Sequence, residues 1–143
     1  MKQALIVDGR DDDERRALFV ISALYHCVDA LRERPVRFVG VSTVEVEIAI
    51  RVLEFDTGIR ATVVEDARNA MEQAFSDAVL YVAVVLEDVD SVSRALAETA
   101  GVRCLVVPQF PREHALSVDN VSRLAAAHSH AGFGALIRTA LSS

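Results

Sequence analysis

The chain has 143 residues, of which 52% are hydrophobic and 25% charged, and its mean hydropathy is +0.28. This composition predicts one domain over 1–143 with a buried core, and it excludes disorder, a collagen-like repeat and a coiled coil. The net charge of −6 argues against nucleic acid as a partner, and the apolar runs are too short for a membrane span. No secretory signal pattern is present, so we expect a cytoplasmic location.

Apolar β-branched runs alternate with longer amphipathic segments along the chain. The first strand is expected at 4–7. The acidic cluster 11–14 then opens one long helix that runs to about Glu33, because negative charge suits the first turn of a helix. Pro35 ends this helix, and 37–41 is the second expected strand.

The next helix is expected to begin at a cap on Ser42 or Thr43 and to end at Gly58. Its side chains expected to face the core are Val46, Ile50, Leu53 and Phe55. A third strand at 61–64 follows. The remaining elements are expected as a short helix at 67–75, a strand at 78–85, a helix at 91–100, a strand at 104–107, and a last helix within 113–141 that breaks near Gly132 or Gly134.

Five strands alternating with helices predict a three-layer α/β/α sandwich around a five-stranded parallel sheet. The turn after the first strand lacks the GxGxxG pattern of dinucleotide-binding folds, and no Walker A loop is present. These absences favour the flavodoxin-like strand order 2-1-3-4-5.

Carboxylates are concentrated where three of the expected strands end. Ligands of open parallel sheets bind at the carboxyl ends of the strands, so we expect an acidic pocket there. Its members are Asp8, Asp11, Asp12, Glu65, Asp66 and Asp88. Clustered carboxylates repel one another unless a cation neutralises them, which makes Mg²⁺ the natural ligand, held by Asp8, Asp66 and Asp88.

The same acids also suit two purely structural roles. Aspartate is a favoured N-cap, and several of the acidic positions open helices. The basic residues near the strand ends can also neutralise the cluster through ion pairs without a metal. These basic residues are Arg10, Arg15, Arg16 and Arg68.

Four segments carry a family resemblance. A strand at 4–8 ends in acids, 41–45 leads to a strand ending at 62–66, and 100–110 contains a strand followed by Pro108. In this order they resemble the response-regulator receiver domain, in a degenerate form. The resemblance implies the flavodoxin-like fold, with metal-binding acids after the first strand and an aspartyl phosphate acceptor at the end of the third.

The chain departs from the receiver pattern at the residues that sense phosphate. Val107 stands at the position of the family's lysine, and Val85 or Leu86 at that of its hydroxyl residue. Glu65 stands at or beside the phosphate acceptor, where a glutamate mimics the charged state. The resemblance therefore implies a pseudo-receiver, a non-catalytic regulatory or interaction domain that binds another protein or a second copy.

Three enzyme-related interpretations compete with the pseudo-receiver interpretation. The carboxylates Asp8, Asp66 and Asp88 would suit a Mg²⁺-dependent hydrolase or phosphotransfer enzyme. The segment 40–67 is similar to the nucleophile region of isochorismatase-like hydrolases, but Val46 stands at the position of the cysteine, which implies an inactive scaffold. The acids after the first and fourth strands also resemble those of PIN-like nucleases.

The remaining reactive side chains are expected to have structural roles. Cys27 and Cys104 lie within apolar segments and are expected to be buried thiols. His128 and His130 are two residues apart, which places them on different faces of a helix and argues against a metal pair. The small residues within 125–134 suit either a homodimer contact or a kinked core helix.

Overall fold

The computed structural model describes residues 3–10, 12–64, 79–107, 116–118, 121–123 and 130–142. Its strands are β1 (Gln3–Asp8), β2 (Val36–Val39), β3 (Ala61–Val64), β4 (Leu80–Val85), β5 (Arg103–Val107), β6 (Leu116–Val118) and β7 (Val121–Arg123). Its helices are α1 (Asp13–Leu24), α2 (Val28–Leu31), α3 (Val44–Thr57), α5 (Val89–Ala100) and α6 (His130–Ser142). Within these residues, no helix combines the length and the apolar character that crossing a membrane requires.

The strands form one sheet in the order β3-β2-β4-β1-β5-β7-β6. The first five are mutually parallel, which confirms the α/β class and the parallel core. The predicted order 2-1-3-4-5 is wrong, because β1 lies between β4 and β5 and does not touch β2. Alternating strands and helices determine that neighbouring strands are parallel, but they do not reveal when a crossover skips a strand.

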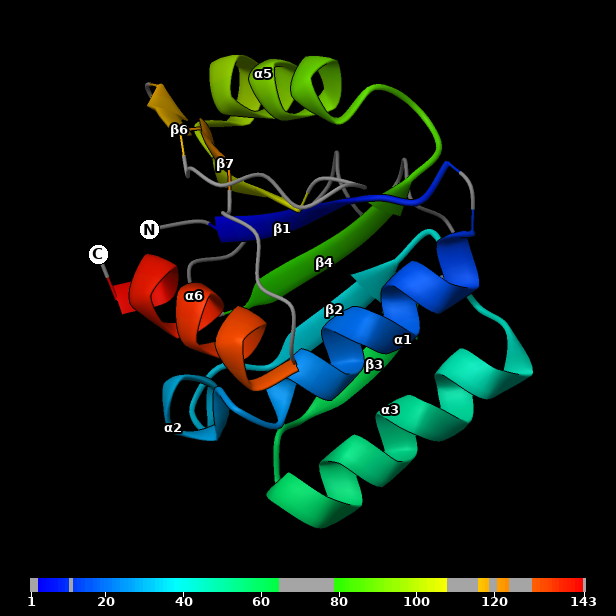
Figure 1. Cartoon of the computed structure of the whole chain (residues 1–143). Coiled ribbons are helices and arrows are strands. Elements are labelled where there is room, and N and C mark those ends of the chain that lie inside the picture. The colour runs from blue at the N-terminus through cyan, green and yellow to red at the C-terminus, as the bar shows by residue number, and fades with distance from the viewer. Residues whose placement is uncertain are drawn as a thin grey trace.

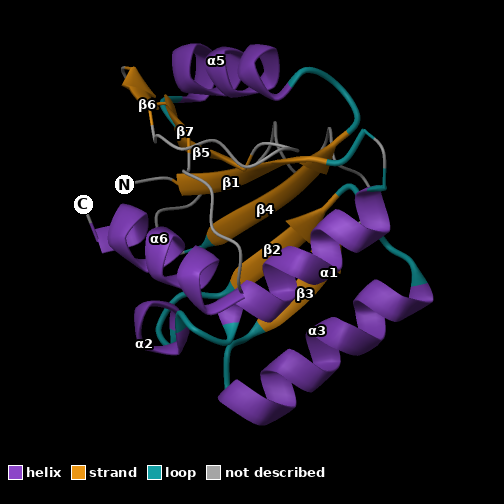
Figure 2. Cartoon of the chain, in the orientation of Figure 1, coloured by secondary structure: helices purple, strands orange, loops and turns teal. Residues whose placement is uncertain are grey.

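The sheet separates two layers of helices. Figure 1 shows α1, α2, α3 and α6 on one face and α5 on the other, and Figure 2 shows the strands between them. Alternate side chains of each strand serve the two layers: Leu5 and Val7 join the core beneath α1, α3 and α6, whereas Ala4 and Ile6 join the core beneath α5. Both faces of the parallel strands are therefore apolar, as expected for a sheet covered on both sides.

The ends of the central helices follow the capping residues in the sequence. The Thr43 hydroxyl accepts a hydrogen bond from the Val46 N–H at 3.3 Å, and α3 ends at Gly58 in the left-handed conformation. Helix α5 ends in the same way at Gly101. The predicted boundaries of these two helices are confirmed to within two residues.

The first long helix was expected to continue to about Glu33, and this expectation is wrong. Helix α1 ends at Leu24, and a turn in which the Cys27 N–H bonds the Leu24 carbonyl at 3.0 Å separates it from α2. Helix α6 packs against this turn, since the Cys27 thiol lies 3.1 Å from the Gly134 carbonyl oxygen. Tertiary packing against α6 thus accompanies a break that local propensity does not predict.

The C-terminal segment also differs from the prediction. The last helix, expected within 113–141, is α6. Strands β6 and β7, which precede it, were not expected; they pair antiparallel, and β7 extends the sheet beside β5. Helix α6 continues through Gly132 and Gly134 without the expected break. A Cβ atom on Gly134 would lie 2.6 Å from the Ala23 carbonyl oxygen, so this small residue allows α6 to approach α1 closely. Gly134 therefore serves packing within the chain.

Candidate functional site

The carboxyl ends of β1 and β4 meet at one edge of the sheet, where the chain leaves in opposite directions. Strands β1 and β4 are neighbours, with Asp8 in register with Val85. The chain continues from β1 into α1 on one face and from β4 into α5 on the other (Figure 1). Such a reversal at neighbouring strand ends is where open α/β sheets place their ligand sites.

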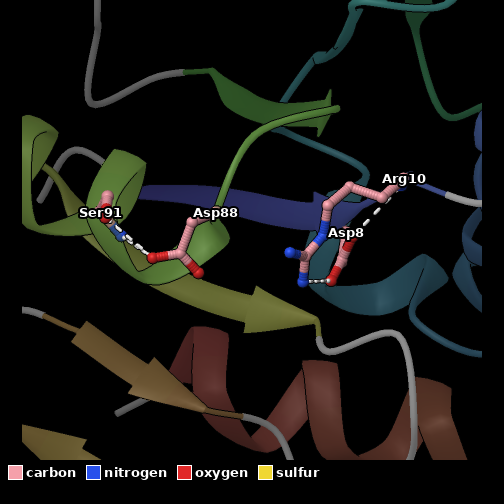
Figure 3. A network of polar contacts seen from close by, with 4 residues as sticks. All are labelled: Asp8, Arg10, Asp88 and Ser91. Carbon is pink, nitrogen blue, oxygen red and sulfur yellow. Dashed lines mark hydrogen bonds and ion pairs between the residues drawn. The ribbon is translucent and has the colours of Figure 1, made fainter.

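Asp8 is the last residue of β1 and is only 2% exposed. Both of its carboxylate oxygens accept hydrogen bonds from Arg10, as Figure 3 shows: Nε donates to Oδ1 at 3.1 Å, and Nη2 donates to Oδ2 at 2.8 Å. The backbone N–H of Arg10 also donates to Oδ1 at 3.2 Å. This two-point ion pair satisfies a carboxylate that burial would otherwise destabilise.

The electrostatics of Asp8 follow from this contact. The hydrogen bond from the Arg10 side chain lowers the pKa of Asp8, and burial opposes this effect without cancelling it. The positive charge of Arg16 lowers the pKa of Asp8 further. Asp8 is therefore ionised at neutral pH, and the expected neutralisation of strand-end acids by arginine is confirmed for Arg10.

Asp88 and Asp12 act as helix caps. Asp88 accepts hydrogen bonds from the Ser91 N–H at 3.3 Å and from the Ser91 hydroxyl at 2.8 Å, at the start of α5 (Figure 3). The pKa of Asp88 is lowered, chiefly by the Ser91 hydroxyl and more weakly by the charge of Arg10. Asp12 accepts from the Arg15 N–H at 3.0 Å and caps α1. The capping role is confirmed for these two acids.

The structure describes only part of the predicted acidic pocket. Asp8 ends β1 and Asp88 follows the neighbouring strand β4 at one edge of the sheet, and the positive charge of Arg10 lowers the pKa of both. Asp11, Glu65 and Asp66 lie outside the described residues, and so does the histidine His128. Across the described ranges, no three His, Cys, Asp or Glu side chains are placed to hold a metal ion. Both oxygens of Asp8 are engaged by Arg10.

The loops after β1 and β2 close tightly on the end of β4. The Gly9 N–H donates to the Val85 carbonyl at 2.9 Å. After β2, a Cβ atom on Gly40 would lie 2.3 Å from the Val84 carbonyl oxygen. Backbone packing therefore occupies the immediate surroundings of the β4 end, and the two glycines make that packing possible.

The residues that differ from the receiver and hydrolase patterns have plain structural roles. Val107 is buried at the end of β5, Val85 is half-buried at the end of β4, and Leu86 beyond it is 64% exposed. Val46 is buried in the core beneath α3, where a nucleophile would be inaccessible. Apolar side chains thus stand at three family positions, those of the receiver lysine, the receiver hydroxyl residue and the hydrolase cysteine.

The outer face of α3 presents a second candidate surface. Val44, Ile48, Val52 and Phe55 are 65%, 53%, 46% and 91% exposed. Val46, Ile50 and Leu53 are buried as expected, but the expectation that Phe55 faces the core is wrong. Phe55 follows Leu53 by two residues, about 200° around the helix, and therefore lies on the opposite side. The four exposed side chains are called the α3 apolar row below.

Sequence reasoning missed this row although its signal was present. The exposed residues are separated by four, four and three positions, the spacing of one helix face. The inward residues form a second row of the same period, so α3 is apolar on two opposite sides. Periodicity alone does not say which row faces the sheet, and Phe55 was assigned to the wrong one.

The two cysteines are buried thiols, as expected. Burial raises the pKa of Cys27 to about 11 and that of Cys104 to about 12. Both side chains therefore remain protonated at neutral pH and are poor nucleophiles.

Comparison of the chain with protein-family models, with curated proteins and with solved structures gave no significant match.

Proposed function

We propose that this chain is a non-catalytic regulatory domain that works by binding another protein and is not switched by aspartyl phosphorylation. The observation that carries the proposal is the α3 apolar row. Its four large side chains are between 46% and 91% exposed. Contiguous apolar groups on a surface helix are typical of protein interfaces, since isolated exposed apolar residues are common on any surface but an aligned row is not.

The arrangement at the strand ends supports the non-catalytic part of the proposal. Asp8 is engaged at both oxygens by Arg10, and Asp12 and Asp88 cap helices. Each described acid of the candidate pocket thus has a structural partner. The proposal retains the function implied by the receiver resemblance but not its fold, because the observed strand order differs from the flavodoxin-like order.

Binding through α3 is tested by affinity capture from a lysate of the source organism, followed by purification of the captured protein. We expect Ile48→Ser/Phe55→Ser to weaken binding of that protein at least about tenfold, because two of the four apolar contacts of the row are lost. Leu86→Ser is the matched control, because Leu86 is also exposed but lies after β4. Equal binding by all three forms, measured by surface plasmon resonance, would show that α3 is not the interface.

Phosphorylation is tested on the intact chain. After incubation with acetyl phosphate and millimolar Mg²⁺, we expect the mass of the chain to be unchanged, because Val107 replaces the cation that a receiver directs at its phosphate. A receiver domain of known activity serves as the positive control in the same reaction. A stoichiometric phosphoryl adduct, detected by intact-mass spectrometry under native conditions, would contradict the proposal.

A further inference from the structure

We infer that the α3 apolar row binds an amphipathic helix of a partner protein whose apolar stripe is flanked by lysine and arginine. The inference rests on the proposed function, because it names the chemistry of the partner that the domain would bind. It is carried by the pattern of charges that flank the row.

The row is narrow and continuous. At 100° per residue, its four side chains fall within an arc of about 80° on α3, opposite the buried residues. They extend from position 44 to position 55, which is about 16 Å of helix at 1.5 Å per residue. This length and width match one face of a single packed helix of about three turns.

Both sides of the row are acidic. Glu47 and Glu54 lie along one side together with Arg51, whereas Glu45 and Asp56 lie along the other. The outer part of α3 therefore carries four carboxylates against one guanidinium. The sign agrees with the net charge of −6 of the whole chain.

This charge pattern disfavours a second copy as the occupant. In a symmetric pair, each α3 would place its acidic sides against the acidic sides of the other, whether the two helices run parallel or antiparallel. Like charges brought together at the edge of an interface are repulsive and oppose association. An anionic lipid surface is disfavoured for the same reason.

A partner helix with basic flanks fits the same surface. Lysine and arginine beside its apolar stripe would lie against the carboxylates of α3, which favours encounter and fixes the orientation of the two helices. The apolar side chains would then supply most of the affinity, with Phe55 as the most exposed aromatic contact.

The test uses three synthetic helical peptides that share one leucine stripe and carry lysine, glutamine or glutamate at the flanking positions. We expect the lysine peptide to bind at least about tenfold tighter than the glutamate peptide in fluorescence anisotropy, with a smaller ratio at high salt. Phe55→Ser should weaken binding of the lysine peptide at least about fivefold. Because Phe55 is 91% exposed, this change leaves the core intact.

A charge-reversed variant makes the test specific to the flanks of the row. Glu45→Lys/Glu54→Lys changes one exposed acid on each side and should make the glutamate peptide the tighter ligand. Asp56 is left unchanged, because its carboxylate accepts a hydrogen bond from the Tyr25 hydroxyl at 3.0 Å. Amide NMR shifts confined to α3 would locate the bound peptide.

Several outcomes would overturn the inference. They are equal affinities for the three peptides, no binding of any peptide at millimolar concentration, or binding unaffected by Phe55→Ser. A dimer in sedimentation analysis that Phe55→Ser dissociates would instead identify a second copy as the occupant. If none of the peptide results supports the inference but binding of a captured protein still depends on Ile48 and Phe55, the proposed function stands. Failure of the inference is therefore distinguishable from failure of the proposed function.

Discussion

Replacing Gly40 by alanine is expected to lower the free energy of unfolding by about 3 kcal/mol, through backbone strain and steric overlap together. Gly40 follows β2 with a φ of +98°, a conformation that alanine adopts only with strain. Its added Cβ would also lie 2.3 Å from the Val84 carbonyl oxygen, on a central strand of the sheet. Strand β4 cannot relieve that overlap without breaking its parallel pairing with β1, where Val84 is in register with Val7. Urea denaturation followed by circular dichroism measures the loss.

Gly58→Ala is the control for this prediction. Gly58 also has a positive φ, +77° at the end of α3, but a Cβ there would meet nothing within 4 Å. The cost of Gly58→Ala should therefore be about 1 kcal/mol, the strain of the left-handed conformation alone. Equal losses for the two variants would show that the loop after β2 is free to move away from β4.

The strands and helix ends of this fold are largely readable from the sequence. The apolar run that forms β4 and the capping groups of Thr43, Gly58 and Asp88 act within a few residues of chain, so local chemistry determines them. The strand order, in contrast, is not determined by local chemistry. The connection from β1 to β2 passes over β4, and no residue in that connection records the skipped strand. Long-range pairing decides it.

The same contrast between local and long-range contacts applies to the candidate site. The ion pair of Asp8 with Arg10 joins residues two apart, and the cap of Asp88 joins residues three apart, so both were accessible to sequence reasoning. The exposure of Phe55 follows from helix geometry only once Leu53 is known to face the core, because tertiary packing decides which side of α3 packs on α1 and the sheet. The β6–β7 hairpin was missed because β7 gains its stability from pairing with β5, far away in the sequence.

Arg10→Met is expected to destabilise the chain by about 2 kcal/mol at pH 7. Breaking a fully buried ion pair lowers the free energy of unfolding by more than this. The Arg10 side chain, however, is 49% exposed, so solvent screens part of its interaction with Asp8. Arg10 holds the pKa of Asp8 below its ordinary value of 3.8. The pair therefore stabilises the fold above the unfolded pKa of Asp8, and this contribution is lost as the pH falls through the folded pKa.

The pH dependence separates the ion pair from simple packing by the arginine. Without Arg10, the pKa of Asp8 rises above its wild-type value, because burial opposes ionisation and the charge of Arg16 is left to favour it. The variant therefore takes up a proton before the wild type does, and the difference in stability narrows as the pH falls from 7 towards 4. Asp8→Asn provides the matched background, because the neutral amide has nearly the same shape. Adding Arg10→Met to Asp8→Asn should cost clearly less than 2 kcal/mol at every pH, since no buried charge is left unpaired. A loss in stability that is the same at pH 7 and pH 4, in both backgrounds, would mean that the ion pair with Asp8 does not contribute to the effect of Arg10.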